Sequence, residues 1–273
     1  MKPKLILTDL DGTLLDDAKQ LSPANRAALE RAAAQGAEVV VATGRFWGGI
    51  PRQLQELPFL RYFILMNGAK VYDRREEISL YRAEIPLATA ERIFDWLEHV
   101  DATVDCYQND VGLMDRRYFD RLDYYIHDLP SRQLVRRTRV VSENFRAAVG
   151  AGGDSVQKIQ CYFPDLTLRQ EIQRKLAIEY PEVVSSISMP ENLEINDIRA
   201  TKGHAMLALC RTLSVDRQET AAFGDGTNDL TMLQWAGTGV AMSNATPQVW
   251  AAADVIAPSN QENGVAQVLN QWF

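Results

Sequence analysis

"KLILTDLDGTLLD", residues 4–16, joins a short apolar run to two closely spaced acidic residues. The apolar run is typical of a strand that is buried on both faces of a parallel sheet. Asp9 and Asp11 stand two residues apart, at the point where that strand should end. Carboxylates this close raise each other's pKa unless a cation lies between them. Because Asp-Gly is also a common turn dipeptide, this stretch alone leaves a surface turn and a charged site equally open.

The same pattern of a buried strand followed by polar residues recurs along the chain. It appears in AEVVVAT (residues 37–43), YFILMNG (62–68) and ETAAFGDGTND (219–229). Between the first two strands, Ser22-Pro23 is a good start for a helix, and Gly36 a good end. Strands that alternate with helices predict a parallel sheet covered by helices, with the polar residues at the carboxyl ends of the strands.

The middle of the chain has a different pattern. Residues 84–188 contain amphipathic helices and half-buried strands, but no further buried strand that ends in a polar cluster. This pattern favours an antiparallel sheet with helices on one face. We therefore expect an α/β protein whose Rossmann-like core, residues 1–83 and 189–273, is interrupted by an α+β domain at residues 84–188.

Composition excludes several classes of protein. The formal net charge of −7 argues against nucleic-acid binding, because no basic surface would balance phosphate repulsion. No apolar run is long enough to cross a bilayer. We expect no secretory signal, because the first apolar run meets Asp9 almost at once. Three widely spaced cysteines indicate free thiols in a reducing compartment. We expect a cytoplasmic protein with a small-molecule ligand, and the sequence leaves its oligomeric state open.

Four polar clusters of the core domain should meet at one edge of the sheet, because the carboxyl ends of parallel strands converge there. Each cluster alone is a weak signal, whereas four in one chain predict a binding site. The clusters are Asp9 with Asp11; Thr43-Gly44-Arg45; Lys202, at an expected helix start; and Asp225 with Asn228 and Asp229.

The chemistry of these clusters indicates a phosphoryl site with a divalent cation. If the first strand continues through Asp11, residues i and i+2 point the same way, and Asp9 and Asp11 face one crevice. Asp225 and Asp229 would bring the number of carboxylates there to four, which requires a cation near neutral pH. Oxygen ligands favour Mg²⁺ over Zn²⁺. Lys202 and exposed backbone N–H groups are suited to an anionic substrate.

Four motifs in this order, DLDGT, ATGR, TKGHAM and GDGTND, resemble those of the haloacid dehalogenase superfamily of phosphohydrolases. The order and spacing, with MNGA after the third strand and a large insert, resemble the Cof-type branch of sugar-phosphatase-like proteins. The resemblance implies that residues 84–188 form a cap that selects the substrate. It covers the core through motifs, and the cap only through position and size.

The resemblance also implies a role for each site residue. Asp9 would be the nucleophile, and Asp11 the acid and base. Mg²⁺ would be held by the Asp9 carboxylate, the Asp11 backbone carbonyl and Asp225. The remaining residues would bind the phosphoryl group or support the metal: Thr43, Gly44, Lys202, Asn228 and Asp229. Arg45 could equally contact the substrate or be solvated at a helix start.

These features predict an Mg²⁺-dependent phosphatase of small phosphorylated metabolites that forms an aspartyl-phosphate. A phosphotransferase or mutase on the same core is the first alternative, and a phosphorylatable regulatory module the second. Sugar phosphates, pyridoxal phosphate and flavin mononucleotide all remain open as substrates, because the cap carries no motif that would choose among them.

Overall fold

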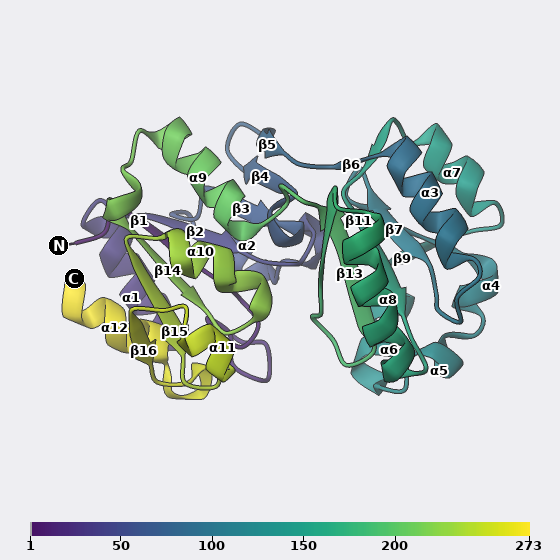
Figure 1. Ribbon diagram of the computed structural model, residues 1–273. Helices are drawn as coiled ribbons and strands as arrows, with labels where there is room; N and C mark the ends of the chain where they lie inside the picture. The colour runs from purple at the N-terminus through teal and green to yellow at the C-terminus, as the bar shows by residue number, and fades with distance from the viewer. Residues whose placement is uncertain (1) are drawn as a thin grey trace. The chain divides into compact units, whose positions relative to one another are not determined.

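The computed structural model describes residues 2–273, which form two compact units (Figure 1). The core unit contains the chain up to Arg82 and from Thr201 to Phe273, and the inserted unit contains Ala83–Ala200. The sequence had placed residues 189–200 in the core, and this boundary was wrong. Strand β13 (Asn192–Asp197) pairs with β11 and β12 of the inserted unit, so the chain returns to the core only after Ala200.

The core unit is built on an eight-stranded sheet of order β16-β15-β14-β1-β2-β3-β4-β5. Its first six strands in that order are parallel, as the sequence predicted, and β4 and β5 extend the sheet as antiparallel strands. Strand β1 lies between β14 and β2, so the loops that follow these three strands are neighbours. The strands are β1 (Leu5–Thr8), β2 (Glu38–Ala42), β3 (Tyr62–Leu65), β4 (Lys70–Asp73), β5 (Ile78–Arg82), β14 (Thr220–Gly224), β15 (Thr238–Met242) and β16 (Val255–Ala257).

Helices cover both faces of this sheet. On one face, α9 and α10 bury apolar side chains against Leu5 and Leu7 of β1, together with residues of β2, β3 and β14. Helices α1 and α12 pack against each other and against β2 and β16. The predicted start of α1 is confirmed, because the Ser22 hydroxyl accepts a hydrogen bond from the backbone N–H of Asn25, and Pro23 is the first helical residue. The helices are α1 (Pro23–Ala34), α2 (Arg52–Gln55), α9 (Lys202–Leu213), α10 (Leu230–Trp235), α11 (Pro247–Trp250) and α12 (Gly264–Trp272).

The inserted unit contains a six-stranded sheet of order β12-β13-β11-β7-β8-β9. All neighbouring strands in it are antiparallel except β8 and β9. A separate pair joins β6 (Ile85–Pro86) to β10 (Ser155–Val156). The strands of the large sheet, besides β13, are β7 (Asp105–Gln108), β8 (Val111–Asp115), β9 (Arg139–Ser142), β11 (Lys158–Tyr162) and β12 (Val183–Ser186).

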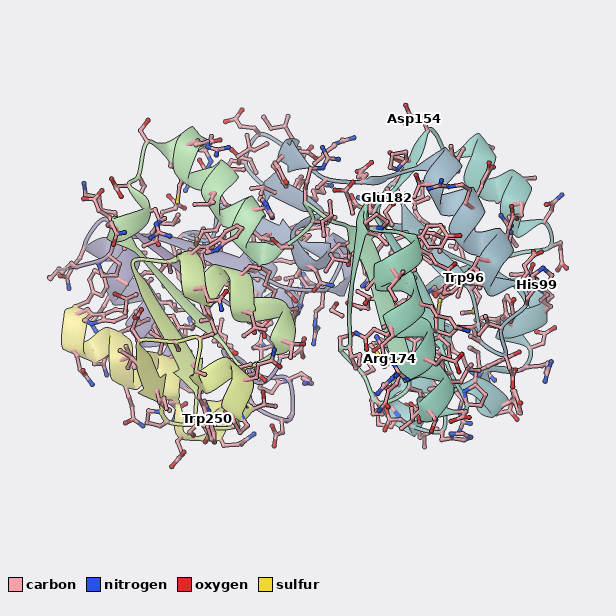
Figure 2. All side chains as sticks on the ribbon, viewed as in Figure 1. Trp96, His99, Asp154, Arg174, Glu182 and Trp250 are labelled. Carbon is pink, nitrogen blue, oxygen red and sulfur yellow. The ribbon has the colours of Figure 1, made fainter. Side chains whose placement is uncertain are left out.

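One face of this sheet forms the core of the inserted unit. Cys106, Ile159 and Ile195 lie on it and pack with buried residues of α3 and α8. Trp96 of α3 lies 5.7 Å, between ring centroids, from Tyr180 at the end of α8 (Figure 2). The helices are α3 (Leu87–Leu97), α4 (Arg116–Phe119), α5 (Leu122–Tyr125), α6 (Leu129–Thr138), α7 (Phe145–Ala151) and α8 (Leu166–Glu179). Among the helices of residues 2–273, none has the length and hydropathy needed to cross a membrane.

The opposite face of the same sheet carries a charged and aromatic network. Arg139 extends from β9 across Gly112 of β8 and donates hydrogen bonds to Asp105 of β7 and to Gln160 of β11. A Cβ atom on Gly112 would stand 2.9 Å from the Arg139 Cδ atom, so the glycine leaves room for this side chain. The Asp105 carboxylate is fully buried. Such a charge requires an ionic partner, and Arg139 provides it.

Candidate functional site

The loops after β1, β2 and β14 bring together the residues that the sequence singled out. Asp9 directly follows β1, Thr43 follows β2, and Asp225 follows β14. Lys202 is the first residue of α9, whose start is fixed because the Thr201 hydroxyl accepts a hydrogen bond from the backbone N–H of His204. Because β14, β1 and β2 are neighbours in the sheet, the three loops lie at one edge of it.

Lys202 lies at the centre of the site. Its Nζ atom is 2.6 Å from Asp9 Oδ1 and 2.5 Å from Asp229 Oδ1, and the side chain is fully buried. Burial alone would lower the pKa of this amine, but Asp229 and Asp9 outweigh that effect and raise it. The side chain is therefore a permanent ammonium ion that links two carboxylates from different segments of the chain.

Asp229 uses both carboxylate oxygens within the protein. Oδ1 accepts from Lys202, and Oδ2 accepts from the backbone N–H groups of Asp225 and Gly226, at 3.0 and 2.9 Å. These bonds fix the loop that carries Asp225. The sequence counted Asp229 among the residues of the metal site, and its contacts in the structure add that it holds Asp225 and Lys202 in place.

Asp225 has one carboxylate oxygen directed at the loop after β1. The Thr13 hydroxyl donates to its Oδ1 atom at 2.7 Å. Gly12 has a φ of +85°, and a Cβ atom there would lie only 2.3 Å from Asp225 Oδ2. Burial and the nearby Asp229 charge raise the pKa of Asp225 to about 6. The close approach of this carboxylate thus requires glycine at position 12.

Three carboxylates of this site could hold one cation. Asp9, Asp225 and Asp229 each offer an oxygen, and the three oxygens lie within 4.8 Å of one another. The pKa of Asp9 is raised by burial and by the charges of Asp229 and Asp225, even though Lys202 opposes the shift. A single ammonium ion does not neutralise three carboxylates, of which Asp9 and Asp229 are buried and Asp225 is half-buried, so this all-oxygen donor set fits a hard divalent cation.

Asp11 does not join this group. Strand β1 ends at Thr8, and the chain turns through Gly12, so the expected i, i+2 alignment of Asp9 and Asp11 does not form. Arg45 instead binds both Asp11 oxygens, Nε to Oδ2 at 2.8 Å and Nη2 to Oδ1 at 2.7 Å.

Two cations therefore share the Asp11 carboxylate, because Lys19 Nζ also lies 2.9 Å from Oδ1. Burial raises the pKa of Asp11, but the hydrogen bonds and charges of Arg45 and Lys19 outweigh it and lower the pKa overall. Its backbone carbonyl is the part that remains for a metal, as the family resemblance implies. Sequence reasoning missed Lys19, because this lysine belongs to no motif and reaches Asp11 only through the fold of the loop.

The remaining predicted residues line the neighbouring loops. Thr43 is buried, and its hydroxyl accepts from the backbone N–H of Arg45 at 3.2 Å, across Gly44. The Asn228 amide donates to the Asn67 side chain at 3.1 Å, which links the loop after β14 to the loop after β3. Asn67 has a φ of +60°, so it serves as a turn residue and also contacts a site residue.

Comparison with known proteins gives consistent matches over nearly the whole chain. The model of the haloacid dehalogenase-like hydrolase family matches residues 6–269. Phosphatase YwpJ of Bacillus subtilis is 32% identical over 286 residues, which cover 97% of this chain and 98% of the relative. The 5-amino-6-(5-phospho-D-ribitylamino)uracil phosphatase YwtE of the same organism is 26% identical over 282 residues, 98% of this chain and 97% of the relative.

Solved structures agree with this assignment. A haloacid dehalogenase-like hydrolase from Bacteroides thetaiotaomicron superposes with a TM-score of 0.84 at 27% identity, over all of both chains. The chain belongs to the haloacid dehalogenase-like hydrolase family. The resemblance to Cof-type phosphatases, drawn from four short motifs, is thereby confirmed.

Proposed function

We propose that this haloacid dehalogenase-like hydrolase is an Mg²⁺-dependent phosphatase of small phosphorylated metabolites, with Asp9 as its nucleophile. Membership of the family, with phosphatases among the relatives, makes the chain a phosphoric monoester hydrolase. One observation carries the finer proposal. The buried ammonium of Lys202 contacts Asp9, and the Asp225 carboxylate lies beside them, so a nucleophile, a fixed cation and a metal ligand share one site.

The donor set defines which residues would hold the metal. Asp9 and Asp225 would bind it through their carboxylates and Asp11 through its backbone carbonyl, with Asp229 fixing Asp225 from behind. Bound Mg²⁺ supplies charge neutralisation for the carboxylates and for the phosphoryl group. Burial, together with the charges of neighbouring carboxylates, raises the pKa of Asp9 and of Asp225, and this supports the arrangement.

The proposed reaction has two displacements at phosphorus. In the first, an Asp9 oxygen forms a bond to phosphorus while the bond to the ester oxygen breaks. Asp11 passes to that oxygen a proton that it must first take up from solvent, because Arg45 and Lys19 lower its pKa and keep its carboxyl ionised. In the second, a water molecule attacks phosphorus, Asp11 takes its proton, and the bond to Asp9 breaks. Lys202 stays protonated throughout and screens the charge of Asp9 from the incoming phosphoryl group.

Phosphate binding is proposed for the residues around this centre. Thr43 and Gly44 present a hydroxyl and a turn of backbone beside Asp9, and Lys202 adds its charge. Asn228 and Arg45 would contact the substrate further out. Arg45 is held on Asp11 and also donates to the Gly49 carbonyl at 2.8 Å, so its guanidinium is already oriented within the site.

The inserted unit, Ala83–Ala200, is proposed to select the organic part of the substrate. The printed name of YwtE describes a phosphorylated ribitylamino-uracil, which is larger than a simple sugar phosphate. A substrate of either kind is compatible with the site described above. A cytoplasmic location is proposed as well, supported by three cysteines that are all free thiols.

The direct test is phosphate release from p-nitrophenyl phosphate and a panel of metabolite phosphomonoesters, with and without Mg²⁺. Activity should require Mg²⁺ and disappear in an Asp9→Asn variant, whose amide is not a nucleophile. Asp216→Asn is the matched control, because Asp216 is exposed and caps a short helix, as asparagine also does. The amount of phosphate released should equal the amount of substrate consumed if the protein is a phosphatase. A phosphotransferase would release less phosphate, because it would transfer the phosphoryl group to another alcohol. An Asp9→Asn protein with full activity would refute the assignment of the nucleophile.

A further inference from the structure

Lys19 is a cation at the site to which neither the motifs nor the proposed reaction assigns a role. Its Nζ atom lies 2.9 Å from Asp11 Oδ1, and its side chain remains 52% exposed. Arg45 already binds both oxygens of the same carboxylate, with its own side chain 28% exposed. Lys19 therefore shares an oxygen that has an ionic partner without it.

The loop between β1 and α1 holds Lys19 in a defined position. The Lys19 backbone N–H donates to the Asp16 carbonyl at 2.9 Å, and the Gln20 N–H donates to Asp16 Oδ1 at 2.8 Å. Lys19 has a φ of +61°, a left-handed conformation that is unfavourable for a residue with a side chain. The amide of Asn260 also donates to the Leu15 carbonyl at 3.0 Å and ties the loop to the rest of the core unit. The lysine is thus directed at Asp11 by its backbone, at an energetic cost.

Two cations contact one carboxylate in this group. Lys19 and Arg45 each carry a positive charge, and both lie on Asp11. Asp17 also lies in this loop; its carboxylate accepts a hydrogen bond from the Asn260 amide at 3.2 Å, and its charge also acts on Lys19. Lys202, by contrast, has two carboxylates for one ammonium. Asp11 is therefore the carboxylate of the site that holds two cations, both on partly exposed side chains.

We propose that Lys19 and Arg45 bind a second anionic group of the substrate, so that the enzyme prefers phosphomonoesters whose alcohol part carries a carboxylate or another phosphate. This inference rests on the proposed function, in which Asp11 serves the oxygen of the leaving alcohol. Arg45 alone can neutralise the Asp11 carboxylate, so Asp11 does not require the second positive charge of Lys19. The pair of partly exposed cations is suited to an anion that arrives on the leaving-group side, because such cations attract and bind it. Lys19 is then a residue that determines specificity.

Competition against p-nitrophenyl phosphate tests this with two compounds that differ in one group. Glycerol 3-phosphate carries a neutral CH₂OH where 3-phosphoglycerate carries a carboxylate. The wild-type protein should bind 3-phosphoglycerate more tightly, as measured by the inhibition constants. Lys19→Gln should raise the inhibition constant of 3-phosphoglycerate about 2-fold to 5-fold, the size expected of one partly exposed ion pair. The constant for glycerol 3-phosphate should stay nearly unchanged.

Two further variants separate charge from structure. Lys19→Arg keeps the positive charge and should retain the preference for 3-phosphoglycerate. Lys4→Gln removes another exposed lysine of the core unit, one paired with Glu219 at 2.7 Å, and should change neither constant. Equal binding of the two compounds by the wild type, no inhibition by 3-phosphoglycerate, or an equal loss for both compounds in Lys19→Gln would each overturn the inference. Absence of p-nitrophenyl phosphate hydrolysis in the wild type would instead reject the proposed function itself.

Discussion

Replacement of Lys202 by methionine tests whether buried charge neutralisation organises the site. Methionine fills similar volume without charge, so Asp9 and Asp229 would lose the ammonium ion that lies 2.6 and 2.5 Å from their oxygens. Both carboxylates are almost completely buried. The variant would therefore contain two desolvated carboxylates with no cationic partner between them.

The size of the effect follows from opposing contributions. An ion pair with charges 4 Å apart is worth roughly 4 kcal/mol at an effective dielectric constant of 20, and Lys202 makes two such pairs. Removing the buried ammonium recovers several kcal/mol of desolvation energy. We expect a net loss of about 3–5 kcal/mol in the free energy of unfolding at neutral pH without Mg²⁺, the range for breaking a buried ion pair.

Urea unfolding at pH 7.5, followed by circular dichroism, measures this loss. Lys4→Met is the control, because Lys4 is 63% exposed and its pair with Glu219 should contribute less than about 1 kcal/mol. The loss in Lys202→Met should become smaller at pH 5, because the carboxylates can then take up protons instead of the lost cation. It should also become smaller with Mg²⁺ present. A loss below about 1 kcal/mol at neutral pH, or one that does not change with pH or Mg²⁺, would refute the reasoning.

Three other changes give distinct results. Gly12→Ala should lower Mg²⁺-dependent activity at least tenfold, because the added Cβ would lie 2.3 Å from Asp225 Oδ2. It should also lower the free energy of unfolding by about 1–2 kcal/mol. Full activity of this variant, with tight Mg²⁺ binding in calorimetry, would contradict this. The pKa of Asp225 is raised from 3.8 to about 6 in the folded protein, so its contribution to the stability of the metal-free protein is fully present below about pH 4 and is lost as the pH rises through about 6. Mg²⁺ binding should accordingly weaken below pH 6, and a calorimetric affinity that is constant from pH 5 to pH 7 would exclude this titration. Arg139→Met should destabilise the protein by about 3–5 kcal/mol, since it leaves the buried Asp105 charge unpaired, whereas Arg139→Met with Asp105→Leu should recover most of that loss in thermal unfolding.

The sequence alone predicted most of the core unit. Apolar runs that end in polar residues identified β1, β2, β3 and β14, because a strand buried on both faces requires an uninterrupted apolar stretch. Ser22 and Pro23 marked the start of α1 for a local reason, since capping depends on residues within one turn. The boundary of the inserted unit was less accurate, because β13 alternates polar and apolar residues in NLEIND, and this alternation does not reveal which sheet the strand joins.

The site residues could also be predicted from the sequence, since Asp9, Thr43 and Asp225 each follow directly after a strand that the apolar runs identify. The partners of these residues were decided by tertiary structure. Asp11 turns toward Arg45 and Lys19 because β1 ends at Thr8, and no pattern within the motif records that ending. Strand periodicity and helix capping act between neighbours in sequence. Ion pairs between segments far apart in the chain depend on how loops converge in space, and only the folded chain determines that.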